Sequence, residues 1–78
     1  MLVLKLVEKS AEKYVYNYHP EDGEVYGVIE IDSMTGEIKV SEIASNDKHR
    51  RYLSHAVRAV ERFLENSSYP ENHLSAWY

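Results

Sequence analysis

The stretch that decides the fold runs from residue 13 to residue 31 and reads KYVYNYHPEDGEVYGVIEI. Its first part alternates Tyr14, Tyr16 and Tyr18 with Val15 and Asn17, and this period of two is typical of a β-strand. The Pro and the Asp-Gly pair in its middle indicate a turn. A second alternating run follows at 25–31, so the stretch predicts two neighbouring antiparallel strands.

Working outward from this hairpin, we expect one more strand on each side. Residues 2–9 alternate in the same way and reach the hairpin through a short connection at 10–12. Residues 32–37 turn the chain again, with Gly36 available for a positive φ, and lead into a fourth strand at 38–43. Four strands with hairpin-length links predict an antiparallel meander over about residues 2–43.

Side-chain parity fixes the expected register, because a slip of one residue would invert every face of a strand. The register that keeps the apolar side chains together pairs Leu6 with Tyr16, Tyr18 with Val25, Ile31 with Ile38 and Glu30 with Lys39. Gly27 then falls opposite Tyr16, whose ring can cover it. The predicted core face collects Leu2, Leu4, Leu6, Tyr14, Tyr16, Tyr18, Val25, Ile29, Ile31, Ile38 and Val40.

The residues after the sheet predict a helix over about 47–66. Ser45, Asn46 or Asp47 supplies its N-cap, and the helix ends before Tyr69-Pro70. An apolar stripe at helical spacing contains Leu53, Ala56, Val57, Val60, Phe63 and Leu64. We therefore expect a single α+β domain over residues 1–78: a four-stranded antiparallel meander, one C-terminal helix packed on one face, and an ordered aromatic tail at 67–78.

The second face of the predicted sheet, which one helix leaves uncovered, carries an apolar set: Val3, Val7, Val15, Tyr26, Val28 and Ile43. Large exposed apolar patches mark interaction sites. Three coverings are open, namely the tail through Leu74, Trp77 or Tyr78, a second copy in a symmetric homodimer, or a foreign protein. We predict a non-enzymatic protein-interaction module that associates with itself through this face, an edge strand or the tail.

A basic line on the predicted helix supports an alternative function. Residues 1–44 carry four lysines against nine acids, whereas residues 45–66 carry five cations against three acids. The line steps by three and four residues through Lys48, Arg51, His55, Arg58 and Arg62. Such a line could bind nucleic acid or an acidic partner. An ordinary solvated helix face explains it as well, and a formal net charge of −4 disfavours a dedicated nucleic-acid binder.

The sequence carries no pattern typical of catalysis or metal binding. With no cysteine there is no disulfide framework and no thiolate site. The four histidines form no helical zinc motif, and no nucleophile–base set or glycine-rich phosphate loop is present. We predict no catalytic residue, metal, cofactor or small-molecule substrate. The apolar start lacks the features of a signal peptide and no stretch suits a membrane span, so we expect a cytoplasmic protein.

Several short segments follow one another in a distinctive order: Tyr16–Glu21, Asp32 with Thr35–Glu37, His55-Ala56, Tyr69–Glu71 and Ala76–Tyr78. This order resembles a group of small uncharacterised proteins of anaerobic Gram-positive bacteria, over most of the chain. The resemblance implies a stand-alone domain in a bacterial cytosolic or mobile-element setting. It implies no activity and transfers no functional residue.

Overall fold

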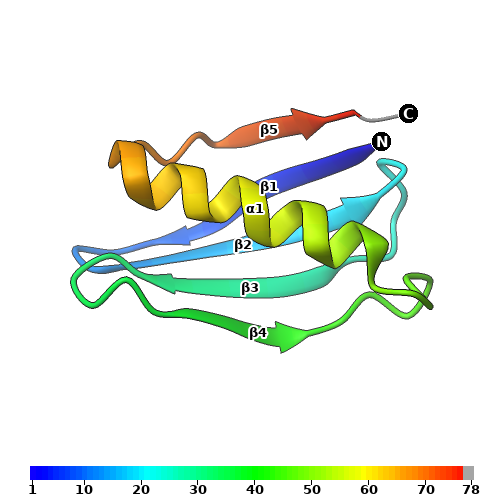
Figure 1. Cartoon of the computed structure of the whole chain (residues 1–78), viewed down its shortest axis with the longest axis horizontal. Coiled ribbons are helices and arrows are strands. Elements are labelled where there is room, and N and C mark those ends of the chain that lie inside the picture. Colours follow the sequence, from blue (N-terminus) through cyan, green and yellow to red (C-terminus); the bar gives the residue numbers. More distant parts are fainter. Residues whose placement is uncertain (77–78) are drawn as a thin grey trace.

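The computed structural model describes residues 1–76 as a five-stranded antiparallel sheet with one helix (Figure 1). The α+β class, the antiparallel sheet and the single helix are therefore confirmed, whereas the strand number is corrected from four to five, because residues 72–75 of the expected tail form a strand. The elements are β1 (Leu2–Lys9), β2 (Lys13–Pro20), β3 (Gly27–Asp32), β4 (Ile38–Glu42), α1 (Arg51–Asn66) and β5 (Asn72–Ser75).

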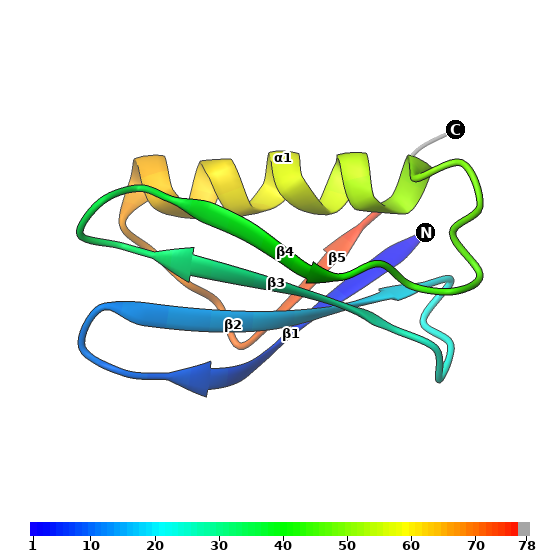
Figure 2. The same ribbon diagram turned by 90° about the horizontal axis from the view of Figure 1, so that it is seen from below.

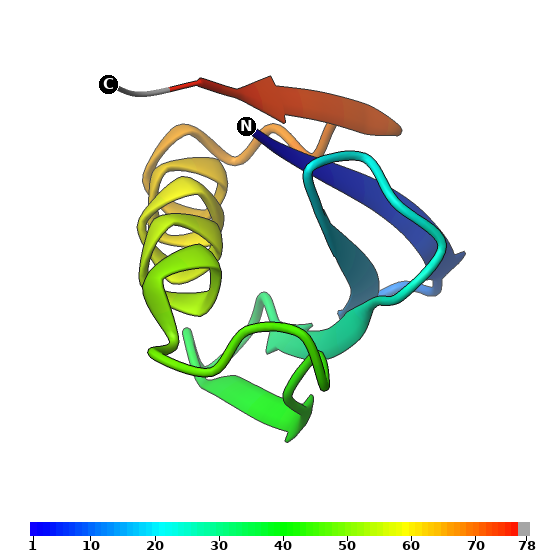
Figure 3. The ribbon, with the colours of Figure 1, turned by 90° about the vertical axis from the view of Figure 1, so that its right-hand side faces the viewer.

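The strands lie side by side in the order β4-β3-β2-β1-β5, so β4 and β5 are the two edges. The helix lies on one side of the sheet, which we call the helix side, and packs on β1, β2 and β3 (Figure 2). The sheet bends around the helix, so the opposite side, which we call the open face, is convex (Figure 3). β5 extends the sheet at the β1 edge and does not fold across the open face.

The core lies between the helix and the middle strands. Its fully buried large side chains include Tyr16 and Tyr18, as the alternation predicted. Val25 and Val40, also expected in the core, are 40% and 37% exposed. Val25 lies in the loop before β3, and Val40 lies on the edge strand, beyond the strands on which the helix packs. The buried apolar residues are Leu2, Leu4, Tyr16, Tyr18, Ile29, Ile31, Ala44, Ala56, Ala59, Val60 and Phe63.

Three of the predicted facing pairs are confirmed: Leu6 with Tyr16, Ile31 with Ile38, and Glu30 with Lys39. The fourth is wrong, because Tyr18 faces Gly27 and not Val25. The difference is two residues, so the paired side chains of β2 and β3 keep their predicted faces. The ring over the strand glycine therefore comes from Tyr18: a Cβ added at Gly27 would lie 2.2 Å from the Tyr18 Cε1 atom.

The helix begins at Arg51, later than the expected residue 47, because the chain first makes a turn that is closed by a hydrogen bond from Arg50 N–H to the Asp47 carbonyl. Asp47 is 5% exposed, and its carboxylate accepts the backbone N–H groups of Tyr52 at 3.2 Å and Leu53 at 2.9 Å. Asp47 thus satisfies two of the N–H groups that a helix start leaves unpaired, although residues 48–50 separate it from the helix. Arg50 has a left-handed backbone with φ 55°.

The helix ends in a turn of the Schellman type at Ser67, which has a φ of 50°. The N–H of Ser67 donates to the Leu64 carbonyl at 3.3 Å, and the N–H of Ser68 donates to the Phe63 carbonyl at 3.1 Å. This turn reverses the chain toward the β1 edge of the sheet.

Side chains of the core then hold the segment that leads into β5. The ring of Tyr69 stacks on that of Tyr14 with 3.8 Å between the ring centroids. The Tyr16 hydroxyl donates to the Pro70 carbonyl at 2.7 Å, and burial raises the pKa of Tyr16 well above its ordinary value. His73 meets the ring of Phe63 edge-on at 5.2 Å. The end of the described chain is therefore ordered, as expected, but as an edge strand.

Candidate interaction surfaces

The open face carries a row of apolar and aromatic side chains near the start of β1. Val3 lies between His19 on β2 and Leu74 on β5, because antiparallel partners share a face. Beyond His19 lies Tyr26, and the centroids of the His19 and Tyr26 rings are 5.3 Å apart. Leu74 is 62% exposed, so the addition of β5 enlarges the apolar surface that it was expected to cover.

The rest of the open face alternates apolar with polar side chains. Val28 faces Asn17, which in turn faces Lys5. Val15 faces Glu30, whose carboxylate lies 2.6 Å from the Lys13 ammonium group. The hydrogen bond from Lys13 lowers the pKa of Glu30 and raises that of Lys13, and a hydrogen bond from the Ser41 hydroxyl lowers the pKa of Glu30 further. Charges therefore separate the valines from one another.

The structure places the predicted contact residues of this face at different positions. Val3, Val15 and Val28 are half-buried on the open face, and Tyr26 is 41% exposed just before β3. Ile43 lies one residue beyond β4, after a register shift between β3 and β4 that ends the simple alternation. Trp77 and Tyr78 lie outside the described residues. His19 and Leu74 join this surface. His19 lies where the strand pattern runs into a turn signal, so alternation did not assign it to a face. Leu74 was a candidate to cover the face from the tail, but β5 lies beside β1 and adds Leu74 to the face.

A second apolar surface lies on the helix side of the β4 edge. Ile38 and Val40 face the buried residues Ile31 and Ile29, so their side chains share the helix side. The helix packs mainly on β1 to β3, and β4 lies to one side of it (Figure 1), with Ile38 partly buried against the core. Val40 is exposed although its cross-strand partner Ile29 is fully buried. We call Ile38 and Val40, with the unpaired edge of β4, the β4 margin.

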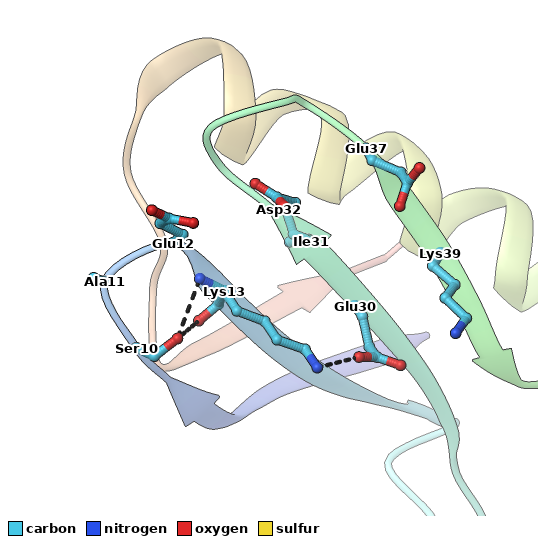
Figure 4. Close-up of a pocket in the computed structure, with 9 residues that line it drawn as sticks. All are labelled: Ser10, Ala11, Glu12, Lys13, Glu30, Ile31, Asp32, Glu37 and Lys39. Carbon is cyan, nitrogen blue, oxygen red and sulfur yellow. Dashed lines mark hydrogen bonds and ion pairs between the residues drawn. The ribbon is translucent and has the colours of Figure 1, made fainter.

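An open depression of about 490 Å³ lies between the β1–β2 and β3–β4 hairpins (Figure 4). Three of its charged side chains are already engaged within the fold: Lys13 pairs with Glu30, and Asp32 accepts the N–H groups of Met34 at 2.9 Å and Thr35 at 3.2 Å. Its lining consists of Ser10, Ala11, Glu12, Lys13, Glu30, Ile31, Asp32, Glu37 and Lys39.

The predicted basic line is divided by the position at which the helix starts. Arg51, Arg58 and Arg62 are exposed on α1, and His55 is half-buried on the same helix. Lys48 precedes α1, in the turn that ends at Arg50. The Asp47 carboxylate already accepts two N–H groups of the first helical turn. An anion at this surface would therefore bind to the cationic side chains and not to the helix end.

Within residues 1–76, no group of three or more His, Asp or Glu side chains is arranged to hold a metal ion. In the same part of the chain, the one helix lacks both the length and the apolar character needed to cross a bilayer. No family model, curated protein or solved structure matches the chain. The comparisons therefore supply neither a family nor a functional residue, and the function is argued from the surfaces alone.

Proposed function

We propose that the chain is a small, non-enzymatic protein-interaction module that associates with itself, and that the β4 margin is the contact surface. The observation that supports this most strongly is Val40: it lies on the helix side, opposite a fully buried isoleucine, and is still 37% exposed. Burial of such an apolar side chain is favourable, so a second strand that extends the sheet and covers it would be stabilised.

The three routes of self-association open at the level of sequence differ in their geometry. The described part of the tail is already paired with β1 as β5. The open face is convex, so two such faces meet over a small area, and charges interrupt its valines (Figure 3). The β4 edge offers both unpaired backbone groups and an apolar flank. The contacts predicted for Val3, Val15, Tyr26, Val28 and Ile43 remain a prediction, as does the cytoplasmic location.

Sedimentation velocity over a range of protein concentrations tests the proposal. We expect a concentration-dependent dimer that Val40→Lys weakens at least about tenfold, because a charge would be buried at the contact. The matched control is Met34→Lys, which makes the same kind of change at a side chain that is 73% exposed in the β3–β4 turn. A wild-type chain that stays monomeric at every concentration overturns the proposal. Dissociation by Val28→Lys, with Val40→Lys inert, would move the contact to the open face.

A second candidate function rests on the exposed cations of α1. All four arginines of the chain lie between residues 50 and 62, and the first turn of the helix holds no acid. This charge distribution favours an anionic partner, such as nucleic acid or an acidic protein surface. Fluorescence anisotropy with short DNA and RNA at low salt tests the nucleic-acid form. Binding should weaken steeply as salt rises and with Arg58→Glu, and lack of binding at low salt removes this form.

A further inference from the structure

We infer that the partner at the β4 margin is a second copy of this chain, whose β4 pairs antiparallel with the first about a two-fold axis at Val40. This inference rests on the proposed function and specifies its geometry. Continuous pairing of two β4 edges needs a two-fold axis perpendicular to the sheet. Such an axis keeps both helices on the same side of one continuous sheet and brings the two β4 margins together.

The β3–β4 turn shows which backbone groups of β4 point to the free edge. Gly36 has a φ of 78°, and its N–H donates to the Asp32 carbonyl at 2.8 Å, while the Asp32 N–H donates to the Glu37 carbonyl at 2.9 Å. This is the pattern of a glycine bulge beside a hydrogen-bonded position. Hydrogen-bonded and non-hydrogen-bonded pairs alternate in an antiparallel ladder, so Lys39 bonds toward β3. The N–H and C=O groups of Ile38 and Val40 are left for a strand on the other side.

Charge decides between the two registers that use those groups. If Ile38 pairs with the partner's Val40, Lys39 lies directly opposite the partner's Lys39, and facing like charges are destabilising. If Val40 pairs with the partner's Val40, Lys39 lies opposite the partner's Ser41 and next to the partner's Glu42. The second register removes the repulsion and adds an attraction on the open-face side of the sheet, so the edge is complementary to itself.

The helix side supports the same register. The two Val40 side chains meet there, with Ile38 of each copy beside them, so the flank that one helix leaves uncovered is closed by the other copy. β4 contains no proline, and both of its charged residues lie opposite open-face residues of β3, Lys39 opposite Glu30 and Glu42 opposite Val28. Inward-pointing charges and prolines are devices by which edge strands avoid pairing. Neither device is present in β4, but a register shift and Lys39, which also oppose edge pairing, are, so the pairing is confined to the few residues around Val40.

Cross-linking through single cysteines tests this pairing directly, because the chain has no cysteine of its own. Facing residues of a hydrogen-bonded pair have Cβ atoms about 5.5 Å apart, which is too far for an unstrained disulfide, so the probe is a short bis-maleimide. We expect Val40→Cys to form covalent dimers at least about tenfold faster than Met34→Cys, because the effective concentration within a dimer exceeds that of micromolar collisions.

Two further variants make the outcomes distinct. Lys39→Cys reports on the register with facing lysines, and Val28→Cys reports on contact through the open face. If sedimentation shows a dimer and Val40→Cys is not the variant that cross-links fastest, the pairing about Val40 is overturned while self-association stands. If all four variants cross-link equally slowly and the wild-type chain sediments as a monomer, the pairing and the proposed function fall together. Far-UV circular dichroism confirms that each variant is folded.

Discussion

Gly27→Ala tests the cross-strand contact on which the β2–β3 register depends. The added methyl group would lie 2.2 Å and 2.5 Å from two ring atoms of Tyr18 and 2.6 Å from the Glu42 carbonyl oxygen. The ring is fully buried, and its hydroxyl is fixed by the Ala44 N–H at 2.9 Å. The Glu42 oxygen belongs to the backbone of β4, so neither neighbour is the free end of a flexible side chain.

The expected loss of stability follows from these distances. Ordinary contacts of a Cβ atom begin near 3.4 Å, so the ring or β4 must shift by about an ångström. Overpacking of a well-packed core costs about 1–3 kcal/mol, occasionally more. We expect about 3 kcal/mol here, because two separate neighbours are too close. Such a loss is a large part of the ~5–15 kcal/mol that stabilises a typical domain.

Urea unfolding followed by far-UV circular dichroism measures the loss. The control is Gly36→Ala, where the added methyl group meets open space and the cost of about 1 kcal/mol comes from the φ of 78° alone. A double variant that also carries Tyr18→Leu should lose less unfolding free energy than the two single variants lose together. The difference should be at least about 1 kcal/mol, because the smaller side chain relieves the clash. Equal losses for the two alanine variants, or strict additivity, would refute the ring-over-glycine reasoning.

Three further predictions concern the ends of the helix and β5. Asp47→Ala should cost about 1–2 kcal/mol and speed amide exchange at Leu53, because two helical N–H groups lose their acceptor; unchanged exchange at Leu53 would argue against this capping role. Ser67→Gly should stabilise the chain by about 1 kcal/mol, since its φ of 50° suits glycine, and a lower urea midpoint would contradict that. Burial, assisted by Arg62, lowers the pKa of His73 below its usual 6.5, so the unfolded chain takes up the proton first. The stability that His73 contributes is therefore present above about pH 6.5 and lost as the pH falls through its folded-state pKa; His73→Leu should flatten the dependence of the urea midpoint on pH, and an identical dependence in both chains would count against it.

Alternation along the strands was sufficient to assign faces but not every partner. It placed Tyr16 and Tyr18 in the core, because a period of two is visible in the sequence itself. It misaligned Tyr18 by two residues, since parity is blind to even shifts, and missed β5, whose four residues have no apolar pattern. β5 exists because β1 offers an edge and because Tyr14, Tyr16 and Phe63 hold the segment against the core. Such tertiary causes leave no local signal.

Of the two apolar surfaces, the sequence predicted the open face and missed the β4 margin. Alternation predicted an uncovered sheet face with Val3, Val15 and Val28, because one helix covers one side of a sheet. It assigned Val40 to the core and so concealed the β4 margin. How far a helix reaches across a sheet depends on its start, its crossing angle and the sheet's curvature, and these are fixed by long-range packing. The start at Arg51 was hidden because three residues, 48–50, lie between Asp47 and the helix whose N–H groups it accepts.

The placement of β1 between β2 and β5 has a consequence for folding during synthesis. Leu2 faces Ser75, so neighbours in the sheet are separated by nearly the whole chain. On the ribosome, the β1–β2 hairpin can close early, whereas the other side of β1 stays bare until the last strand emerges. Closing so long a loop costs entropy before its few pairs form. The emergence of β5, and not the assembly of the meander, therefore governs when the native sheet is complete.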